Sequence, residues 1–511
     1  MGGEIKVRRA GLVSFGVKIG STLTGLIFVV VVTRNLSILE FGLWQLISRT
    51  VAYSVFAANI LYFWTLRYRA RGVTLGKTVL VGSFIFAAVL TLVYLITSLL
   101  VANSVGQASP STTNLYFFLV STPAVPLYII VGTLEYILWG FRPEVASYGF
   151  GIFEIAKVII GGVLVAVFRL SLTGAILGVI GAQVVQLVVT VVLTRREYFD
   201  KVSFVMLGTM LKTGWLALLN SLYPLVMNFD FLVVGLLTGS ANPLAIYGAA
   251  VTIATVLTYS SVIASGLYAS ILGGKDPRQS TNQVLELQYL FTLPMLAGVI
   301  ILSHDLLSLL KPVYTQAVPI LIVLAFGAAL FSFSLSFDTI VTGTDTTDAS
   351  READFALYSK SKMFLISKIN IVLAAGYLAV VTITASIFKN GSGSFLGIQG
   401  YGFLFLGWSI AYFSMGLLAV VFKLNYVRKI TTLLIPMRTA SALSVGTVAF
   451  TVVLYLLSII IHPSGGVLLQ AGRILLIGAI SLSVYAAIVL VVSSQMRALA
   501  KSAIHSILRV S

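Results

Sequence analysis

The sequence predicts an all-α, polytopic membrane protein, and three observations lead to that fold class. Of its 511 residues, 58% are hydrophobic and only 10% are charged, against roughly 25% charged residues in an average soluble domain. Apolar stretches of about 20 residues recur along the chain, each long enough to cross a hydrocarbon core roughly 30 Å thick. Basic residues gather in every second connection between these stretches. Because a backbone in lipid must satisfy its own hydrogen bonds, each stretch is expected to be a helix.

About fourteen such stretches follow one another along the chain. The spans are expected near residues 11–33, 41–64, 78–102, 114–139, 147–168, 172–194, 213–238, 244–271, 284–305, 317–342, 364–388, 396–422, 437–461 and 467–492. The connections are short, and the longest polar one, Thr342 to Lys362, is expected to form a short surface helix. Since no loop is large enough for a soluble catalytic domain, the sequence predicts one integral membrane domain.

The basic residues sort by side of the membrane. Most of the 33 lysines and arginines lie at the amino terminus or in every second connection after it. The opposite side holds Arg34, Arg169, Lys311, Lys389 and Arg473. By the positive-inside rule, this asymmetry predicts a multi-pass protein of the cell membrane with both termini in the cytoplasm. The net charge of +17 is therefore attributed to orientation and to contact with anionic membrane lipids, and not to nucleic acid.

A weak internal repeat divides the spans into two halves. A span, a loop and Phe41-Gly42 resemble a later span, loop and Tyr247-Gly248. The repeat predicts a six-helix N-terminal lobe (residues 1–200) and a six-helix C-terminal lobe (residues 201–430). Both lobes enter from the cytoplasm, so a pseudo-two-fold axis along the membrane normal is expected to relate them, as in transporters whose site lies between two halves. Residues 431–511 then add two extra C-terminal helices, spans 13 and 14, and a cytoplasmic tail.

Three cations, Lys18, Arg49 and Lys157, lie inside segments that are otherwise apolar spans. A charge at the centre of a bilayer costs about 3 kcal/mol or more, so the three suggest a cavity that receives an anionic group. Arg49 is too deep in its span to reach the interface easily. Lys18 is nearer the cytoplasmic face, where its long stem can snorkel outward. Lys157 follows Glu154 by three residues, so this pair is either an internal salt bridge or part of a ligand site.

Asp230 lies in the middle of an expected span and has two interpretations. An intramembrane carboxylate can couple transport to protons or sodium ions, or take part in gating. Alternatively, Asp230 is a structural partner for one of the three cations. Glu135, Glu286 and Asp338, which lie near expected helix ends, are interpreted as interfacial anchors. His304 and Asp305, at the outer end of a span, are interpreted as a solvated rim, with a pH-sensing pair as the alternative.

The sequence excludes several kinds of chemistry. It has no cysteine, which excludes disulfides, thiolate metal sites and cysteine nucleophiles. It contains no HExxH, P-loop or GxSxG motif and no Asp-rich metal cluster. We therefore expect no enzyme, no catalytic residue, no metal and no cofactor. Any energy source is then an ion gradient, the membrane potential or the gradient of the substrate.

Three stretches carry a resemblance to a known family. They are Asp230-Phe-Leu-Val-Val-Gly235 with Ala245-Ile-Tyr247-Gly-Ala-Ala250, Leu306-Leu-Ser-Leu-Leu310 with Tyr314-Thr-Gln-Ala317 and Pro319-Ile-Leu321, and Gly20 to Gln45 with Thr33-Arg34-Asn35-Leu36 and Phe41-Gly42. In these stretches the chain resembles Wzx-type polysaccharide flippases of the multidrug/oligosaccharidyl-lipid/polysaccharide (MOP) exporter superfamily. The motifs are loose and hydrophobic, and the resemblance in topology covers most of the chain.

The resemblance implies a transporter that flips an anionic lipid-linked oligosaccharide or polysaccharide precursor from the cytoplasmic to the outer leaflet by alternating access. It also implies that Lys18, Arg49 and Lys157 face a cationic central cavity. The partners expected from it are a polyprenyl-linked diphosphate glycan, membrane lipids and glycan-assembly proteins. Cations suit a diphosphate because they replace the water around it, and arginine can do so with two parallel hydrogen bonds.

Three other functions can be compared with this one. A multidrug or cation antiporter of the same superfamily usually has twelve spans and exports cations; spans 13 and 14 and the cationic candidates argue against it. A membrane glycosyltransferase or ligase needs a sizeable outer loop with paired carboxylates or a metal site, and the longest outer connection, Phe388 to Ser394, is too small. A non-transporting membrane assembly scaffold is compatible with the sequence.

Overall fold

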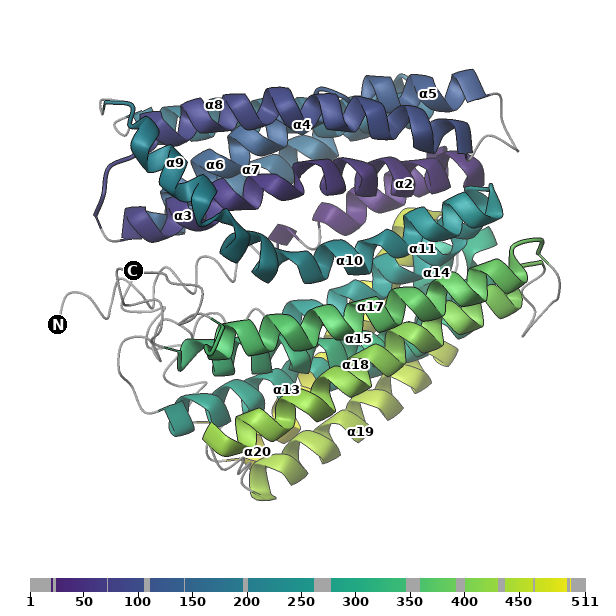
Figure 1. The fold of residues 1–511 in the computed structure, drawn as a ribbon. Coiled ribbons are helices and arrows are strands. Elements are labelled where there is room, and N and C mark those ends of the chain that lie inside the picture. The colour runs from purple at the N-terminus through teal and green to yellow at the C-terminus, as the bar shows by residue number, and fades with distance from the viewer. Residues whose placement is uncertain are drawn as a thin grey trace. The chain divides into compact units, whose positions relative to one another are not determined.

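A computed structural model of the chain is helical in every regular element of the residues that it describes (Figure 1). These residues are 20–21, 24–70, 72–104, 111–141, 143–195, 201–261, 277–345, 359–391, 400–430, 437–462, 465–493 and 497. Among them, 12 helices are long and apolar enough to cross a membrane, or 13 if the bent pair Leu285–Ile301 and Ser303–Leu310 is one span. A shorter apolar helix, Thr24–Asn35, overlaps the end of the first expected span. The expectation of an all-helical chain with many apolar spans is confirmed.

The chain divides into two compact units. The first comprises Met1–Gly248, Ser350–Lys360 and Ser367–Trp408. The second comprises Ala249–Ala349, Ser361–Ile366 and Ser409–Ser511. The division passes through three helices, α11 (Asn242–Ala254), α17 (Lys362–Phe388) and α18 (Gly402–Ile430).

The first unit contains most of the N-terminal helices, with α7 packed along α8 and α6 packed against α3, α4 and α8 (Figure 1). Its elements, after helix Thr24–Asn35, are α2 (Ile38–Val55), η1 (Phe56–Ala58), α3 (Asn59–Ala70), α4 (Gly76–Ser104), α5 (Ser111–Val120), α6 (Ala124–Phe141), α7 (Pro143–Gly162), η3 (Val163–Val167), α8 (Ser171–Thr194), α9 (Phe204–Lys212), α10 (Gly214–Thr238), the start of α11, most of α17 and the start of α18.

The sequence itself fixes the start of α2. Ser37 is the N-cap, and its hydroxyl accepts a hydrogen bond from the Glu40 N–H at 3.2 Å, while the Glu40 carboxylate accepts one from the Ser37 N–H at 2.8 Å. This capping box satisfies two of the N–H groups that a helix start leaves without partners. The other Glu40 oxygen accepts a hydrogen bond from the Ser171 hydroxyl at 2.6 Å, which ties the start of α2 to the start of α8.

One expected span is broken where proline removes a backbone donor. The span expected at residues 114–139 is formed by α5 and α6, joined by a turn at Ser121, Thr122 and Pro123. In that turn the Thr122 N–H bonds the carbonyl of Leu119, so the Phe118 carbonyl loses its usual helical partner. The Tyr94 and Ser121 hydroxyls donate to Phe118 instead, at 3.0 and 2.8 Å. The Phe118 carbonyl thus gains hydrogen bonds from Tyr94 of α4 and from Ser121 of the turn.

The second unit is built around α13, α15, α19 and α20. Its elements, after the end of α11, are η5 (Thr255–Ser261), α13 (Pro277–Ile301), α14 (Ser303–Leu310), η6 (Pro312–Ala317), α15 (Val318–Gly343), the rest of α18, α19 (Met437–Ile460) and α20 (Val467–Val492). Helices α19 and α20 pack along each other and against α13, with Leu302, Phe450 and Tyr485 in one buried cluster. The bend between α13 and α14 is 71°.

Arg473 connects this bend to the last two helices. Its guanidinium donates to the Asp305 carboxylate at 3.0 Å, to the Ser458 carbonyl at 2.7 Å and to the Ile461 carbonyl. The two carbonyls lie at the C-terminal end of α19, where a helix leaves carbonyls without partners and favours a cation. The side chains of Arg473 and Asp305 are only 7% and 16% exposed. The interpretation of Asp305 as a solvated rim is therefore wrong, and Arg473 is a buried helix-terminal contact, not a loop charge.

We predict that Arg473→Ala lowers the free energy of unfolding of the full chain in detergent by about 2–3 kcal/mol, because it leaves the Asp305 carboxylate and two carbonyls without their donor. Arg473→Lys should recover little of that loss, since one ammonium cannot reproduce the planar guanidinium, whose N–H groups reach all three acceptors. Thermal unfolding curves measure the effect. Arg428→Ala, at an exposed position of α18, is the matched control; an equal loss there would contradict the assigned role of Arg473.

Candidate functional site

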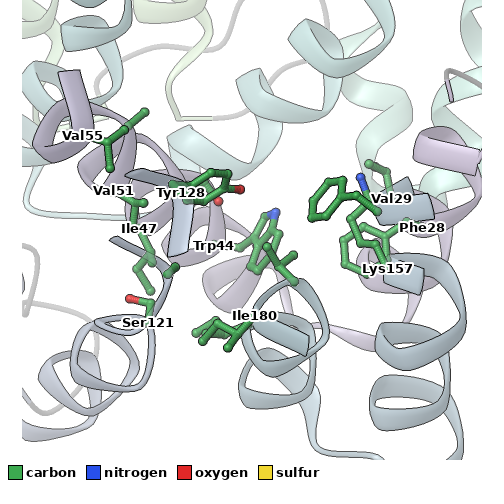
Figure 2. A pocket seen from close by; sticks show the side chains of 16 residues that line it. Phe28, Val29, Trp44, Ile47, Val51, Val55, Ser121, Tyr128, Lys157 and Ile180 are labelled. Carbon is green, nitrogen blue, oxygen red and sulfur yellow. The ribbon is translucent and has the colours of Figure 1, made fainter. Parts of the chain in front are cut away.

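A cavity of about 430 Å³ lies within the first unit. Its walls come from helix Thr24–Asn35, α2, the α5–α6 turn, α6, α7 and α8. The lining is mostly apolar, and aromatic side chains contribute much of it, among them Phe28, Trp44, Tyr128 and Phe153. Figure 2 shows Lys157 grouped with Phe28 and Val29, with Trp44 next along the cavity. The cavity therefore offers an apolar, largely aromatic surface and one cationic side chain.

Lys157 is held in this wall as part of an ion pair. Its ammonium lies 2.9 and 2.8 Å from the two carboxylate oxygens of Glu154, one helical turn earlier on α7. The Phe28 and Phe153 rings lie 5.3 and 5.1 Å from the ammonium, within the range of a cation–π attraction. The two side chains are 14% and 9% exposed. The salt bridge expected as one of two alternatives is present, and its lysine also lines the cavity.

Helix α2 separates the cavity from a second cluster. Residues Trp44, Ile47 and Val51, spaced three and four apart, line the cavity. Gly42, Gln45, Arg49 and Tyr53 follow the same spacing on another face of the helix. That second face meets α10 and the start of α11. One helix therefore carries both the cavity wall and the contact described next.

Arg49 lies at the contact between α2 and α10, not among the residues that line the cavity. Its guanidinium donates a hydrogen bond to the side-chain oxygen of Asn228 and lies 3.9 Å from the centre of the Phe231 ring. One turn along α2, the Tyr53 hydroxyl donates to the backbone carbonyl of Asn228. The Asn228 amide in turn donates to the Pro224 carbonyl at 2.8 Å. Arg49 and Tyr53 therefore clamp one residue of α10 from both its side chain and its backbone.

Asp230, two residues beyond the clamp, is buried at 5% exposure and joins α10 to α17 and α18. One of its carboxylate oxygens accepts hydrogen bonds from the Tyr377 hydroxyl at 2.5 Å and the Trp408 indole N–H at 2.9 Å. The other accepts one from the Phe231 N–H at 2.7 Å. Trp408 stacks on Tyr247 with ring centres 3.6 Å apart. Among the described residues, the hydrogen-bond donors to Asp230 are neutral groups.

The glycines of the aromatic-Gly pairs lie where α2 meets the start of α11. A Cβ atom on Gly42 would lie 2.0 Å from the carbonyl oxygen of Ala241, and one on Gly248 would lie 2.9 Å from the Gln45 side chain. Both distances are shorter than van der Waals contact. The glycines of Phe41-Gly42 and Tyr247-Gly248, which indicated the internal repeat, therefore also permit the close crossing of α2 with the start of α11.

Sequence reasoning misplaced several buried charged groups. Lys423 directly follows the span expected at residues 396–422, which places it in a cytoplasmic connection by sequence, but it is fully buried in α18 and pairs with Asp338 of α15 at 2.7 Å. Its ammonium also donates to Ser334 at 2.6 Å. Glu286, interpreted as interfacial, is 1% exposed. Glu135 accepts a hydrogen bond from Gln186 at 2.6 Å within the first unit, so it too is not simply an interfacial anchor.

Two expectations remain, the cavity role of Lys18 and the absence of a metal site. Lys18 lies outside the described residues. Within the described ranges, no group of three or more His, Asp or Glu side chains is placed to hold a metal ion.

No protein-family model matches the chain, and no curated protein matches it in sequence. Its fold is similar to those of solved transporters. A MATE-family multidrug-resistance transporter of the MOP superfamily, in an inward-facing conformation, aligns with a TM-score of 0.60 at 14% identity over 82% of this chain and 98% of that chain. The lipid II flippase MurJ, in an inward closed conformation, aligns with a TM-score of 0.61 at 15% identity over 92% and 98%.

A MOP superfamily transporter from Pyrococcus furiosus aligns with a TM-score of 0.57 at 12% identity over 83% of this chain and 96% of that chain. At these identities the likeness establishes the fold and no more. Together with the apolar helices, it indicates a multi-pass membrane protein with the fold of MATE transporters and MurJ.

Proposed function

We propose that this protein is a membrane transporter that moves an anionic lipid-linked oligosaccharide or polysaccharide precursor from the cytoplasmic to the outer leaflet. The observation that carries the proposal is the cavity of about 430 Å³, in which one lysine stands among apolar and aromatic side chains. Such a surface suits an amphipathic ligand, because aromatic faces can stack on sugar rings while a cation balances a diphosphate. The similarity in fold to MATE transporters and MurJ supports transport as the activity.

The proposed architecture has fourteen spans, both termini in the cytoplasm of a cell-membrane protein, and two six-helix lobes. The lobes are residues 1–200 and 201–430, related by a pseudo-two-fold axis, with residues 431–511 as two added helices and a tail. Alternating access would come from rocking of one lobe against the other around the site. A polyprenyl tail would remain in lipid while the hydrated headgroup passes through the cavity. Glycan-assembly proteins are the proposed partners that supply or receive the glycan.

Arg49 has two proposed roles in this cycle. It belongs to the first lobe and Asn228 to the second, so the clamp on Asn228 has to open when the lobes separate on this side. Once freed, the guanidinium would be available to the diphosphate headgroup. Lys157 and Lys18 are the other proposed headgroup residues, and the assignment of Lys18 rests on the sequence alone. Binding of the headgroup would then compete with closure of the clamp.

We propose structural and gating roles for Asp230 and Glu154. Asp230 accepts from three neutral donors, and its oxygens therefore face N–H and O–H groups and not the set of oxygen ligands that a sodium ion requires. This favours a fixed junction of α10, α17 and α18 that positions Asn228 for the clamp. Glu154 neutralises Lys157 in the cavity wall and would release it to an incoming anion. Ion coupling through either carboxylate is the alternative role.

One observation favours a second candidate function. Because Glu154 pairs with Lys157, the charged groups of the cavity wall neutralise each other, and the remaining lining is mostly apolar. A wall of that kind also suits a hydrophobic cation, which is the cargo of a multidrug antiporter. A non-transporting assembly scaffold is the third alternative, and it requires no cargo in the cavity.

Transport by the full-length protein in liposomes distinguishes these functions. The probes are a fluorescent polyprenyl-diphosphate disaccharide, whose leaflet is read by quenching from outside, and the cationic dye ethidium. We expect movement of the disaccharide and not of ethidium. Arg49→Ala should slow that movement about tenfold or more, the effect of losing one charge-assisted contact, and Lys157→Gln should slow it less. Lys212→Gln, at an exposed lysine, is the control.

The outcomes separate the three candidates. Ethidium transport without disaccharide transport would overturn the flippase in favour of the antiporter. Movement of neither probe would support the scaffold. Disaccharide transport that is unchanged in both Arg49→Ala and Lys157→Gln would leave a flippase but refute the role of these cations.

A further inference from the structure

A buried amide without partners lies beside the cavity. Gln183 of α8 is 1% exposed, and within the described part of the chain neither its side-chain nitrogen nor its oxygen has a hydrogen-bond partner. An amide buried in this way is unfavourable unless a water molecule satisfies it. Val179 and Ile180, which line the cavity, lie one helical turn before Gln183 on the same face of α8. The cavity wall therefore lies one helical turn from the amide.

A carboxylate lies one turn further along the same face. Gln186 donates a hydrogen bond to Glu135 of α6 at 2.6 Å. Helix α6 carries Glu135 on the face that lines the cavity through Ala124 and Tyr128, since these residues follow at spacings of four and seven. Helices α6 and α8 thus run from the cavity wall to the Glu135–Gln186 pair. On α8, Gln183 lies between the cavity-lining Ile180 and Gln186.

Helix α7 closes the third side of this region. A Cβ on Gly181 would lie 3.2 Å from Ile160, and one on Gly149 would lie 3.3 Å from Thr190 and 3.8 Å from the Glu135 carboxylate. Between these two contacts, α7 carries Glu154 and Lys157 alongside the stretch of α8 that carries Gln183 and Gln186. In this antiparallel register Gln183 lies opposite Lys157 and Gln186 lies opposite Glu154, so the unpartnered amide lies one helical turn nearer the cavity than the Glu135–Gln186 pair.

We propose that Gln183 holds a water molecule that links the cavity to Glu135, so that Glu135 binds and releases a proton in exchange with water in the cavity. In the binding step a hydronium ion gives its proton to a carboxylate oxygen of Glu135, leaving a carboxylic acid and a neutral water; no other bond changes. The Gln183 amide offers both an acceptor and a donor, so it can bind that water in either direction of transfer. This site differs from Asp230, whose carboxylate is already surrounded by donors from protein groups.

The ionisable side chains around Glu135 come from α2, α3, α4, α6 and α7. Tyr62 of α3 and Tyr136 of α6 lie close enough to interact electrostatically with it, and their rings stack with centres 4.9 Å apart. Arg49 of α2 is engaged with α10. On α3, Arg69 lies against Gly140, about one turn beyond Glu135, and Arg67 and Tyr68 precede it. Further ionisable side chains on the neighbouring elements are Tyr128 of α6, Tyr148, Glu154 and Lys157 of α7, and Lys77 and Tyr94 of α4. The α8 residues here, Gln183, Gln186 and Thr190, are uncharged.

Infrared difference spectra of the full-length protein, recorded after a drop in pH, test this site without any transported substrate. We expect a carbonyl band of a protonated carboxylic acid that is lost in Glu135→Gln. In Gln183→Leu the band should persist but appear about tenfold more slowly, as expected for losing one water-mediated bridge. Gln183→Asn, which keeps an amide but withdraws it, should lie between the two. Gln288→Leu, at a fully buried glutamine of the second unit, is the matched control.

Two results would overturn the proposal: an unchanged band in Glu135→Gln, or a rate in Gln183→Leu equal to that of the wild type and of Gln288→Leu. Melting temperatures identify any variant that is misfolded, and Gln183→Asn then replaces Gln183→Leu as the test. The inference goes beyond the proposed function and does not depend on it. A flippase without a protonating Glu135, and a protonating Glu135 without disaccharide transport, are distinct outcomes of the two experiments.

Discussion

Gly42→Ala is expected to separate α2 from the start of α11, although alanine is the better helix former by about 1 kcal/mol. The added methyl carbon would lie 2.0 Å from the Ala241 carbonyl oxygen and 2.7 Å from its carbon. Both are backbone atoms, so no side-chain rotation can relieve the overlap and the helices must move apart. Overpacking of this kind costs about 1–3 kcal/mol, or more when the backbone cannot yield. If the clamp of Arg49 and Tyr53 closes this side of the transporter, the variant will favour its open state.

The absence of cysteine from the natural chain makes this shift measurable. Gln45→Cys with Gly248→Cys introduces one pair at the crossing, where the Gln45 side chain now lies in contact with Gly248. We expect this pair to cross-link readily in membranes, and Gly42→Ala to reduce the yield several-fold. Gly376→Ala serves as the control because a Cβ there meets nothing within 4 Å. Equal cross-linking in both variants would contradict a tight crossing at Gly42.

Hydropathy and charge patterning predicted the class of this fold because each is a property of a whole segment and does not depend on the segment's neighbours. Twenty apolar residues in a row carry enough signal to identify a helix without knowledge of its neighbours. The same holds for local pairs: Glu154 and Lys157 are three residues apart, and the helix alone brings them together. Gly42 and Gly248 were visible as a pattern, but the reason for them, a close crossing of α2 with the start of α11, required the structure.

The partners of the buried charges could not be predicted in the same way. Lys423 lies one residue beyond the span expected at residues 396–422, so it was assigned to a connection, whereas α18 continues to Ile430. Its partner Asp338 is distant in sequence, and an apolar pattern does not encode which face of one helix meets which face of another. The roles of Asn228 and Gln183 could not be predicted for a related reason, because neutral amides barely affect hydropathy. Yet Asn228 receives the contacts of Arg49 and Tyr53, and Gln183 is buried without a hydrogen-bond partner among the described residues.

Lys423→Met is expected to be among the most destabilising single substitutions in the second unit. The ammonium is fully buried and lies 2.7 Å from the Asp338 carboxylate, whose side chain is 18% exposed. Removing the lysine takes away the ammonium that lies 2.7 Å from a largely buried carboxylate, and breaking a buried ion pair in this way costs about 3–5 kcal/mol. Asp338→Asn should be comparably harmful, because the buried Lys423 ammonium would lose this carboxylate and keep neutral acceptors such as the Ser334 hydroxyl. Chemical unfolding of the full chain in detergent measures both losses.

The double variant Lys423→Met/Asp338→Asn distinguishes a charge pair from two independent packing sites. A buried pair costs desolvation that its attraction only partly returns, so replacing both charges is much less harmful than replacing one. We therefore expect the double variant to be more stable than either single variant, with a coupling of about 2 kcal/mol or more. Lys429→Met, at an exposed position of the same helix, controls for the loss of a cation. Losses that simply add would mean that Lys423 and Asp338 contribute separately, and that the buried charge of α18 is balanced by some other group.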